Sequence, residues 1–307
     1  MNAADQAQSS LSSAWLDEEV ITAATRCKIA VFITFHFRPQ RLSYLSDMLR
    51  VLGEYPVSHM EIYICTNTSE LSEITTLRRL FKFLLVGEKL GHVITCSGLT
   101  HAFDLTWSHK PLLEAAFTDS EKSFTHFIYL EDDIRFSFTN FLFFLKFSEP
   151  LSKYRLIPGF VRVEFNYKEG DLFLSDCHAP MRINDRNAVD IGGIRFVNSD
   201  YPYMAMFVLN RTQMGEYISS RSFNKTSSES VCDWWIAERA AMGLTWEAVP
   251  PGFTSRIAIP IDPSNSLPLP VSLIHHIPNN YTNDYTDRPE YVFGRLNVVD
   301  AFKAGNS

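Results

Sequence analysis

The sequence predicts an α/β protein built on a doubly wound, mostly parallel β-sheet. Over residues 28–130, short apolar runs alternate with longer segments of helical periodicity. The apolar runs are continuous rather than alternating with polar residues, which is typical of strands buried on both faces of a parallel sheet. Because strands and helices alternate, the crossover connections are expected to be right-handed and the strands parallel.

The strand and helix boundaries of this half follow from the residue pattern. Residues 28–35 form an uninterrupted apolar run, and residues 41–53 carry leucine and methionine at helical spacing, with Gly53 as a helix stop. Pro111 suits the first turn of a helix that covers residues 112–117. The remaining predictions are strands at 60–65, 91–96 and 125–130 and a helix at 70–84.

The second half is predicted to be rich in loops. Residues 158–209 indicate short strands joined by long loops, and a helix is expected from just after Ser230 to about Met242. Several prolines between 250 and 270 indicate an extended tail. We therefore expect a flexible arm or loosely docked helix at 1–25, followed by one domain over 26–307 with halves at 26–150 and 151–307.

Composition excludes several classes of protein. The chain has 307 residues, a net charge of −7 and 46% hydrophobic residues, which argues against nucleic-acid binding and favours a packed core. The five cysteines are scattered and form no CxxC pair, so reduced thiols are expected. No signal peptide or membrane-spanning segment is predicted. The expected location is the cytoplasm, with loose attachment to a membrane left open.

Glu131, Asp132 and Asp133 follow the strand at 125–130 and are the strongest functional signal. Adjacent carboxylates repel one another, and a divalent cation relieves this repulsion. Hard oxygen ligands suit Mg²⁺ or Mn²⁺ carried by a diphosphate. The structural alternative is a solvated acidic turn beside a helix capped by Ser137. A nucleoside triphosphatase is disfavoured because the chain has no GxxxxGK[ST] loop.

The segment from Phe127 to Asp133 resembles the acidic motif of GT-A glycosyltransferases. Its Glu-Asp-Asp form is similar to that of N-acetylglucosaminyltransferase I and its relatives. The resemblance implies a GT-A-like, Rossmann-type fold with a nucleotide-sugar-binding first half and an acceptor-side second half. It also implies that Asp133 binds Mn²⁺ or Mg²⁺ and that Glu131 and Asp132 contact the donor.

Further segments resemble that family over about residues 28–260. Cys232-Asp233-Trp234-Trp235 is similar to an Asp-Asp-Trp segment in which the Asp before Trp is the catalytic base. Ser255-Arg256 resembles a downstream Ser-Arg pair, and Trp107-Ser108-His109-Lys110 resembles a basic and aromatic segment near the donor phosphates. The chain departs from the pattern at Cys232, where the family has an acidic residue, and no membrane anchor is evident.

Asp233 is the candidate catalytic base, because an inverting transfer needs a carboxylate that removes the proton of the acceptor hydroxyl. The structural alternative is a capping box in which Ser230 and Asp233 hold a helix start. Glu238 and Glu247 are the next candidates. Trp234 and Trp235 are expected to offer an aromatic platform to an acceptor sugar, with one of them packed in the core.

Other residues are candidate ligands of the donor. His109 and Lys110 precede a helix whose N-terminus suits a diphosphate. Arg38 and Asn67 lie in the loops after the first two strands, where they are expected to contact the nucleotide, with ordinary loop roles as the alternative.

His275 is assigned to the metal, although the His275-His276 pair lies in a strand where only one ring faces the cleft. A structural histidine is the alternative. Arg162, Glu164 and Asn166 alternate along one strand face, where they either line the acceptor pocket or form a buried ion pair.

The expected function is metal-dependent transfer of a sugar from a nucleotide-diphosphate donor, with a UDP-sugar favoured, to a hydroxyl of a glycan, lipid-linked or protein acceptor. Inversion is favoured over retention, but both use such a fold. Two alternatives remain open. One is a nucleotidyltransferase-like enzyme, although Phe35 to Pro39 contains no glycine for a phosphate loop. The other is a non-catalytic carbohydrate-binding relative.

Overall fold

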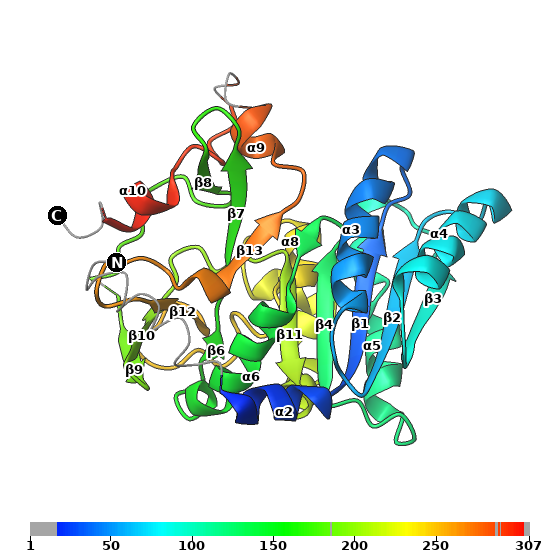
Figure 1. Cartoon of the computed structure of the whole chain (residues 1–307), viewed down its shortest axis with the longest axis horizontal. Coiled ribbons are helices and arrows are strands. Elements are labelled where there is room, and N and C mark those ends of the chain that lie inside the picture. The colour runs from blue at the N-terminus through cyan, green and yellow to red at the C-terminus, as the bar shows by residue number, and fades with distance from the viewer. Residues whose placement is uncertain (1–16, 185, 286–287, 289, 304–307) are drawn as a thin grey trace.

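The fold is organised around a five-stranded central sheet (Figure 1). The computed structural model describes residues 17–303 except 185, 286–287 and 289. Strands β1 to β4 run parallel and β11 is antiparallel at one edge. The sheet order is β11-β4-β1-β2-β3, made of β11 (Met206–Asn210), β4 (His126–Glu131), β1 (Lys28–Phe35), β2 (His59–Thr66) and β3 (Lys89–Thr95).

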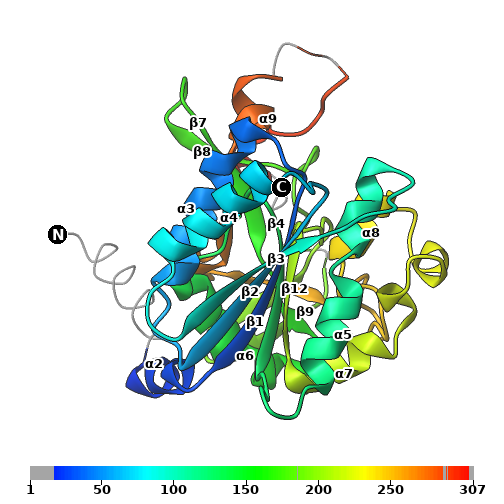
Figure 2. The ribbon, with the colours of Figure 1, turned by 90° about the vertical axis from the view of Figure 1, so that its right-hand side faces the viewer.

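The parallel, strand-helix arrangement predicted for the first half is confirmed. Seven of the eight residues of β1 are buried, which explains why its apolar run is continuous. Helices α3 and α4 cover one face of the sheet and α5 and α7 cover the other (Figure 2). These helices are α3 (Leu42–Gly53), α4 (Leu71–Leu84), α5 (Lys110–Thr118) and α7 (Arg211–Ile218).

Helix α6 (Phe138–Ser152) connects the central sheet to the second half of the chain. Ser137 accepts a hydrogen bond from the backbone N–H of Asn140 and caps this helix, as the sequence predicts. Two of its phenylalanines, Phe138 and Phe141, pack against Tyr55, which follows α3. The phenylalanine-rich segment after the acidic triplet is therefore a core helix. None of the helices in the described part of the chain has the length and apolar character to cross a bilayer.

Two small four-stranded sheets build the second half. One has the order β6-β12-β10-β9, with β6 (Ile157–Pro158), β12 (Ile257–Ile261), β10 (Ile194–Asn198) and β9 (Ala188–Ile191). The other has the order β5-β13-β7-β8, with β5 (Ile134–Arg135), β13 (Leu273–His276), β7 (Val161–Asn166) and β8 (Asp171–Leu174). Short helices α8 (Ile236–Ala241), α9 (Asn280–Asn283) and α10 (Val298–Lys303) complete the chain.

The prediction of a helix from just after Ser230 to about Met242 is wrong in its start, and the observed helix is shorter. Helix α8 begins at Ile236, and the Ser230 hydroxyl instead donates to the carbonyl of Ser227 within the preceding 3-10 turn. The ring of Trp234 packs edge-on against Tyr203 and Trp246, with centroids 5.2 and 5.5 Å apart. This aromatic packing holds the segment before α8 in a non-helical conformation.

Helix α2 (Glu18–Thr25) is the described part of the predicted N-terminal arm, whose residues 1–16 lie outside the described residues. Asp17 accepts a hydrogen bond from the Val20 N–H and an ion pair from Lys146 of α6. Val20 and Ala24 are buried. Residues 17–25 therefore form a helix docked on the domain.

Strand β13 brings the C-terminal part of the chain to the acidic triplet. It pairs with β5, which directly follows the triplet, and with β7. The Ile277 N–H donates to the carbonyl of Asp133 at 2.9 Å. Segments that are far apart in sequence thus meet at the carboxyl end of β4.

Gly53, the predicted helix stop, is the last residue of α3, and the end of α4 lies directly against it. A Cβ at this position would collide with the carbonyl oxygen of Leu84. We expect Gly53→Ala to lower the free energy of unfolding by about 1–3 kcal/mol, because overpacking against backbone forces α3 and α4 apart. Thermal unfolding measures this effect. Ser72→Ala on the exposed side of α4 is the control, and equal melting temperatures for both variants would contradict the prediction.

Candidate functional site

The acidic triplet lies at the carboxyl end of β4 and is held by two partners that the sequence did not single out. Tyr203 donates its hydroxyl to Glu131 at 2.8 Å. Arg41 donates from Nε to Asp132 at 2.8 Å and from a terminal nitrogen to Asp133 at 2.8 Å, and it forms a second contact to Asp132. Arg41 belongs to the short helical turn after β1. Its place at the carboxyl edge of the sheet was the one feature of the sequence that could have indicated a contact with the triplet.

The three carboxyl groups differ in their affinity for protons. Burial and the neighbouring charge of Asp133 raise the pKa of Glu131 to about 8. Burial also raises the pKa of Asp132 to about 6, against the opposing effect of Arg41. Burial acts in the same direction on Asp133, but His276, Arg41 and Arg162 outweigh it and hold its pKa below the ordinary value. Asp133 is therefore the member of the triplet that keeps its negative charge most firmly.

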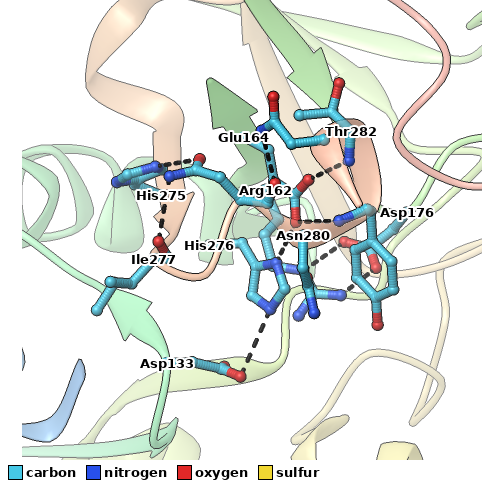
Figure 3. A network of polar contacts seen from close by, with 12 residues as sticks. Asp133, Arg162, Glu164, Asp176, His275, His276, Ile277, Asn280 and Thr282 are labelled. Atoms are coloured by element: carbon cyan, nitrogen blue, oxygen red, sulfur yellow. Dashed lines mark hydrogen bonds and ion pairs between the residues drawn. The ribbon is translucent and has the colours of Figure 1, made fainter. Parts of the chain in front are cut away.

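His276 lies between Asp133 and a second buried carboxylate (Figure 3). Its Nε2 is 3.5 Å from Asp133 Oδ2, and its Nδ1 contacts Glu164. Glu164 is fully buried and also accepts the backbone N–H of Thr282 at 2.7 Å. Burial lowers the pKa of His276, but its bonds to Asp133 and Glu164 raise the pKa above the ordinary value.

The assignment of a metal-binding role to His275 is corrected by this arrangement. Its Nε2 contacts Asn279 Oδ1 at 2.8 Å, and Figure 3 shows its ring directed away from Asp133. Neighbouring residues of a strand point to opposite faces, so only His276 can reach the triplet from β13. The expectation that one of the two rings faces the cleft is confirmed.

A cavity of about 590 Å³ opens beside Glu131, Asp133 and His276. Its walls combine acidic and aromatic side chains. Arg162 lines it as the sequence suggested, and is also ion-paired with Asp176 and placed 5.3 Å from the Tyr203 ring centroid. The further lining residues used below are Asp233, Trp234, Trp235, Glu238 and Trp246.

The candidate bases differ in their surroundings. Asp233 lines the cavity, is exposed, and has no hydrogen-bond or ion-pair partner among the described residues. Glu238 also lines the cavity, and its Oε2 is buried without a partner in the described part of the chain. Glu247 does not line the cavity, because its carboxylate accepts hydrogen bonds from the backbone N–H and hydroxyl of Ser222. The predicted capping role of Asp233 is wrong, since Trp235 is the N-cap residue of α8.

Trp234 and Trp235 differ in exposure, as expected for a pair of which one ring packs against the protein. Trp235 is 75% exposed at the cavity, whereas Trp234 packs between Tyr203 and Trp246. The Nε1 of Trp246 is buried without a partner among the described residues and is available as a donor. An exposed indole next to free polar groups is the type of surface that binds sugar rings.

A second cavity, of about 390 Å³, lies beyond the carboxyl ends of β1, β2 and β3. It is lined by His36, Asn67 and the loop after β3. Asn67 Oδ1 accepts the Phe37 N–H at 2.8 Å. Its amide nitrogen makes no other bond among the described residues and is available to a ligand. Arg38 is exposed in the neighbouring loop and does not line this cavity.

The diphosphate-binding roles predicted for His109 and Lys110 are corrected. Lys110 is 5% exposed, and its Nζ donates to the Tyr217 hydroxyl and to the Ala240 carbonyl. Four aromatic rings surround this ammonium group: Trp107, Phe207, Tyr217 and Phe223. His109 is fully buried and stacks on Tyr129 with centroids 4.1 Å apart. Burial lowers the pKa of both side chains, and neither lines a cavity described above.

Two side chains at the triplet have the chemistry of metal ligands, the carboxylate of Asp133 and the imidazole of His276. Asp133 Oδ1 is buried and has no partner among the described residues, and the imidazole of His276 lies on the other oxygen. Among the described residues no group of three histidine, cysteine or acidic side chains could hold a metal by itself. Mg²⁺ commonly binds one or two protein carboxylates and takes its other ligands from phosphate and water.

Comparison with known proteins does not assign the chain to a family. No protein-family model matches it, and no curated protein matches it in sequence. The function is therefore inferred from the chemistry of the site.

Glu164 is expected to stabilise the site by holding the His276 ring. Glu164→Gln keeps the size of the side chain but removes its charge, and we expect a loss of about 2 kcal/mol in the free energy of unfolding because a buried charge-assisted hydrogen bond is weakened. Chemical denaturation measures the loss. Glu169→Gln, at an exposed position of the loop after β7, is the matched control and is expected to change stability by less than about 0.5 kcal/mol. Equal stabilities of the two variants would count against this role of Glu164.

Proposed function

We propose that this protein is a metal-dependent glycosyltransferase that moves a sugar from a nucleotide-diphosphate donor to an acceptor hydroxyl. The observation that carries the proposal is Asp133, a carboxylate at a sheet edge whose pKa is held below the ordinary value. Its Oδ1 is buried without a partner among the described residues, and it lines the 590 Å³ cavity. Open α/β sheets bind their ligands at this edge. The resemblance of residues 127–133 to the GT-A acidic motif adds support.

Two cavities at one sheet edge suit a donor that consists of a nucleotide and a sugar. The cavity beyond β1 to β3 offers the free amide nitrogen of Asn67 to a nucleotide base. The cavity beside the triplet has room for a sugar and an acceptor. We assign Glu131, with its raised pKa, to a hydrogen bond with a donor hydroxyl, since its protonated carboxyl can both donate and accept. Asp132 is bound by Arg41 and is assigned to positioning that arginine.

Asp133 and His276 would hold Mn²⁺ or Mg²⁺ together with the diphosphate. When bound, the metal neutralises charge on the departing nucleotide diphosphate. Glu164 orients the ring of His276 by accepting from Nδ1, as carboxylates behind metal-binding histidines commonly do. Arg41 contributes a fixed positive charge next to Asp133.

Asp233 is assigned to the acceptor hydroxyl as general base. It is solvent-exposed, lines the cavity and has no competing partner in the described part of the chain, so its carboxylate is available to take a proton. The exposed ring of Trp235, two residues later, is placed to stack on an acceptor sugar. Glu238 is the second candidate base, because its Oε2 lacks a partner among the described residues.

One observation favours a second candidate function, a carbohydrate-binding protein without turnover. Arg41 already gives Asp132 and Asp133 a counter-charge, as a metal ion would. A protein of this kind would bind glycan at the aromatic cavity and show no metal-dependent affinity for nucleotides.

Nucleotide binding separates the two candidates. We expect one nucleoside diphosphate to raise the melting temperature only when Mn²⁺ is present, by an amount equivalent to about 2.7 kcal/mol when the ligand is 100-fold above its Kd. Asp133→Asn is expected to abolish the Mn²⁺-dependent part of the shift, because it removes the charge of the metal ligand. Asp190→Asn, at an exposed position of β9, is the matched control. Absence of a shift with every nucleotide would reject the transferase and favour the carbohydrate-binding protein.

The rate of sugar transfer tests whether Asp233 is the general base. With the donor identified by that panel, we expect Asp233→Asn to lower the rate of sugar transfer by about 10²- to 10⁴-fold while leaving nucleotide binding unchanged, because the amide cannot accept the proton. Glu238→Gln measured in parallel decides between the two carboxylates. A wild-type rate for Asp233→Asn together with a large loss for Glu238→Gln would move the role to Glu238.

A further inference from the structure

The second cavity contains a cysteine that the proposed transferase chemistry does not use. Cys96 directly follows β3 and lines the cavity of about 390 Å³. It is partly exposed, so a small reagent can reach it from solvent. All five cysteines lie in the described part of the chain and are free thiols, which makes a direct comparison among them possible.

A second thiol lies beside Cys96. In the parallel register of β2 and β3, Cys65 pairs with Ile94 and Thr66 pairs with Thr95. The Cys96 N–H continues this ladder by donating to the Thr66 carbonyl at 2.8 Å. Because side chains two residues apart lie on the same face, Cys96 is on the face of the sheet that carries Ile94 and Cys65. The Cys65 thiol is buried and interacts with Cys96, whose Sγ also lies 3.7 Å from the Ile94 carbonyl oxygen.

The surroundings of Cys96 stabilise a thiolate. Hydrogen bonds from Cys65 and Ser108 and from the backbone outweigh burial and lower the pKa of Cys96 to about 6. The interaction with Cys96, together with burial, raises the pKa of Cys65 well above its ordinary value. The other three thiols have raised pKa values and are expected to be less reactive: burial raises the pKa of Cys27 to about 11, and desolvation also raises those of buried Cys177 and partly exposed Cys232.

We propose that Cys96 is a peroxide-reactive thiol in the second cavity and that Cys65 converts its oxidised form into a disulfide between β2 and β3. The proposal names a modification site and does not depend on the transferase activity. It requires an accessible nucleophilic sulfur and a neighbouring thiol on the same sheet face, and the register of β2 and β3 provides both.

The chemistry needs hydrogen peroxide as the oxidant and no other reagent. The Cys96 thiolate attacks one peroxide oxygen, the O–O bond breaks, and the released hydroxide takes a proton to form water, leaving a sulfenic acid on Cys96. The Cys65 sulfur then attacks the sulfenic sulfur, a second water leaves, and an S–S bond forms. Two thiols lose two electrons and two protons in total, and one peroxide is reduced to two waters.

The first test compares thiol reactivity in the native full-length protein. At pH 7 a thiol with a pKa near 6 is about 90% thiolate, so iodoacetamide is expected to label Cys96 at least about tenfold faster than Cys27, Cys177 or Cys232. The pH midpoint of its labelling rate is expected near 6. Labelling of Cys96 no faster than that of Cys232, with an ordinary thiol midpoint, would overturn the proposal without any variant being made.

The second test detects the disulfide. Trypsin places Cys65 and Cys96 in separate peptides, residues 51–78 and 90–122. After treatment of the native protein with hydrogen peroxide, these peptides are expected to be recovered joined to each other by mass spectrometry, and to separate on reduction. Recovery of Cys96 joined to a different cysteine, or of both thiols unmodified, would overturn the assignment of Cys65.

Three variants sharpen the result. Cys65→Ser is expected to stop the reaction at a dimedone-reactive sulfenic acid on Cys96, because serine cannot resolve the acid to a disulfide. Cys96→Ser is expected to abolish both rapid labelling and the disulfide. Cys232→Ser, which removes a partly exposed thiol without a cysteine neighbour, is the matched control and is expected to leave both unchanged. Rapid labelling that persists at the wild-type rate in Cys96→Ser would overturn the assignment of the reactive thiol to Cys96.

Discussion

The contact on which the rest of the structure depends is the pairing of Arg41 with Asp132 and Asp133. Three adjacent carboxyl groups at the end of a buried strand repel one another, and burial increases the cost of their charge. Arg41 offsets that cost with a planar, bidentate donor that matches a carboxylate. Its position after β1, the strand next to β4, follows from the parallel order of the sheet. The parallel order of β1 and β4 therefore also determines which side chain neutralises the acidic triplet.

The same constraint explains why the tail of the chain returns to the central sheet. Asp133 is also contacted by His276, and the backbone on either side is joined by the bond from Ile277 to the Asp133 carbonyl. Behind His276, Glu164 is buried and fully used by hydrogen bonds. The small sheet containing β5, β13 and β7 thus fixes the positions of Asp133, His276 and Glu164, with the imidazole between the two carboxylates. A loop of the same sequence could not hold these groups at fixed distances.

The parts of the fold that were predictable are those where one local signal dominates. The strands at 28–35 and 125–130 and the helix at 41–53 follow from apolar runs and helical spacing, and the structure places them within about one residue of the predicted bounds. The start of α8 was not predictable, because the packing of Trp234 between two distant aromatic rings overrides the capping signal of Ser230. Local sequence carries no information about such rings.

The candidate site likewise contains residues that the sequence placed correctly and residues that only the tertiary structure could place. Glu131, Asp133 and Asp233 do lie on one cavity, since they belong to the sheet edge and to a loop that faces it. The placement of His109 and Lys110 failed because a basic residue at a helix start was read as a ligand of phosphate, whereas the ammonium of Lys110 is enclosed by four aromatic rings. The choice of His275 failed because strand alternation says that one ring faces inward but not which one. No sequence motif includes Arg41, so its contacts with the triplet could be identified only from the tertiary structure.

The position of β13 after β4 in the chain has a consequence for the order in which the acidic site is assembled. Residues up to the end of β4 contain four of the five strands of the central sheet, with only β11 still to be added. His276 follows Asp133 by 143 residues. During synthesis, Arg41 is therefore the first partner the acidic triplet can meet, and the histidine joins only after β7 and β13 have been made. The wall of the aromatic cavity is also incomplete until then, because Tyr281 and Phe293 follow His276 in the chain.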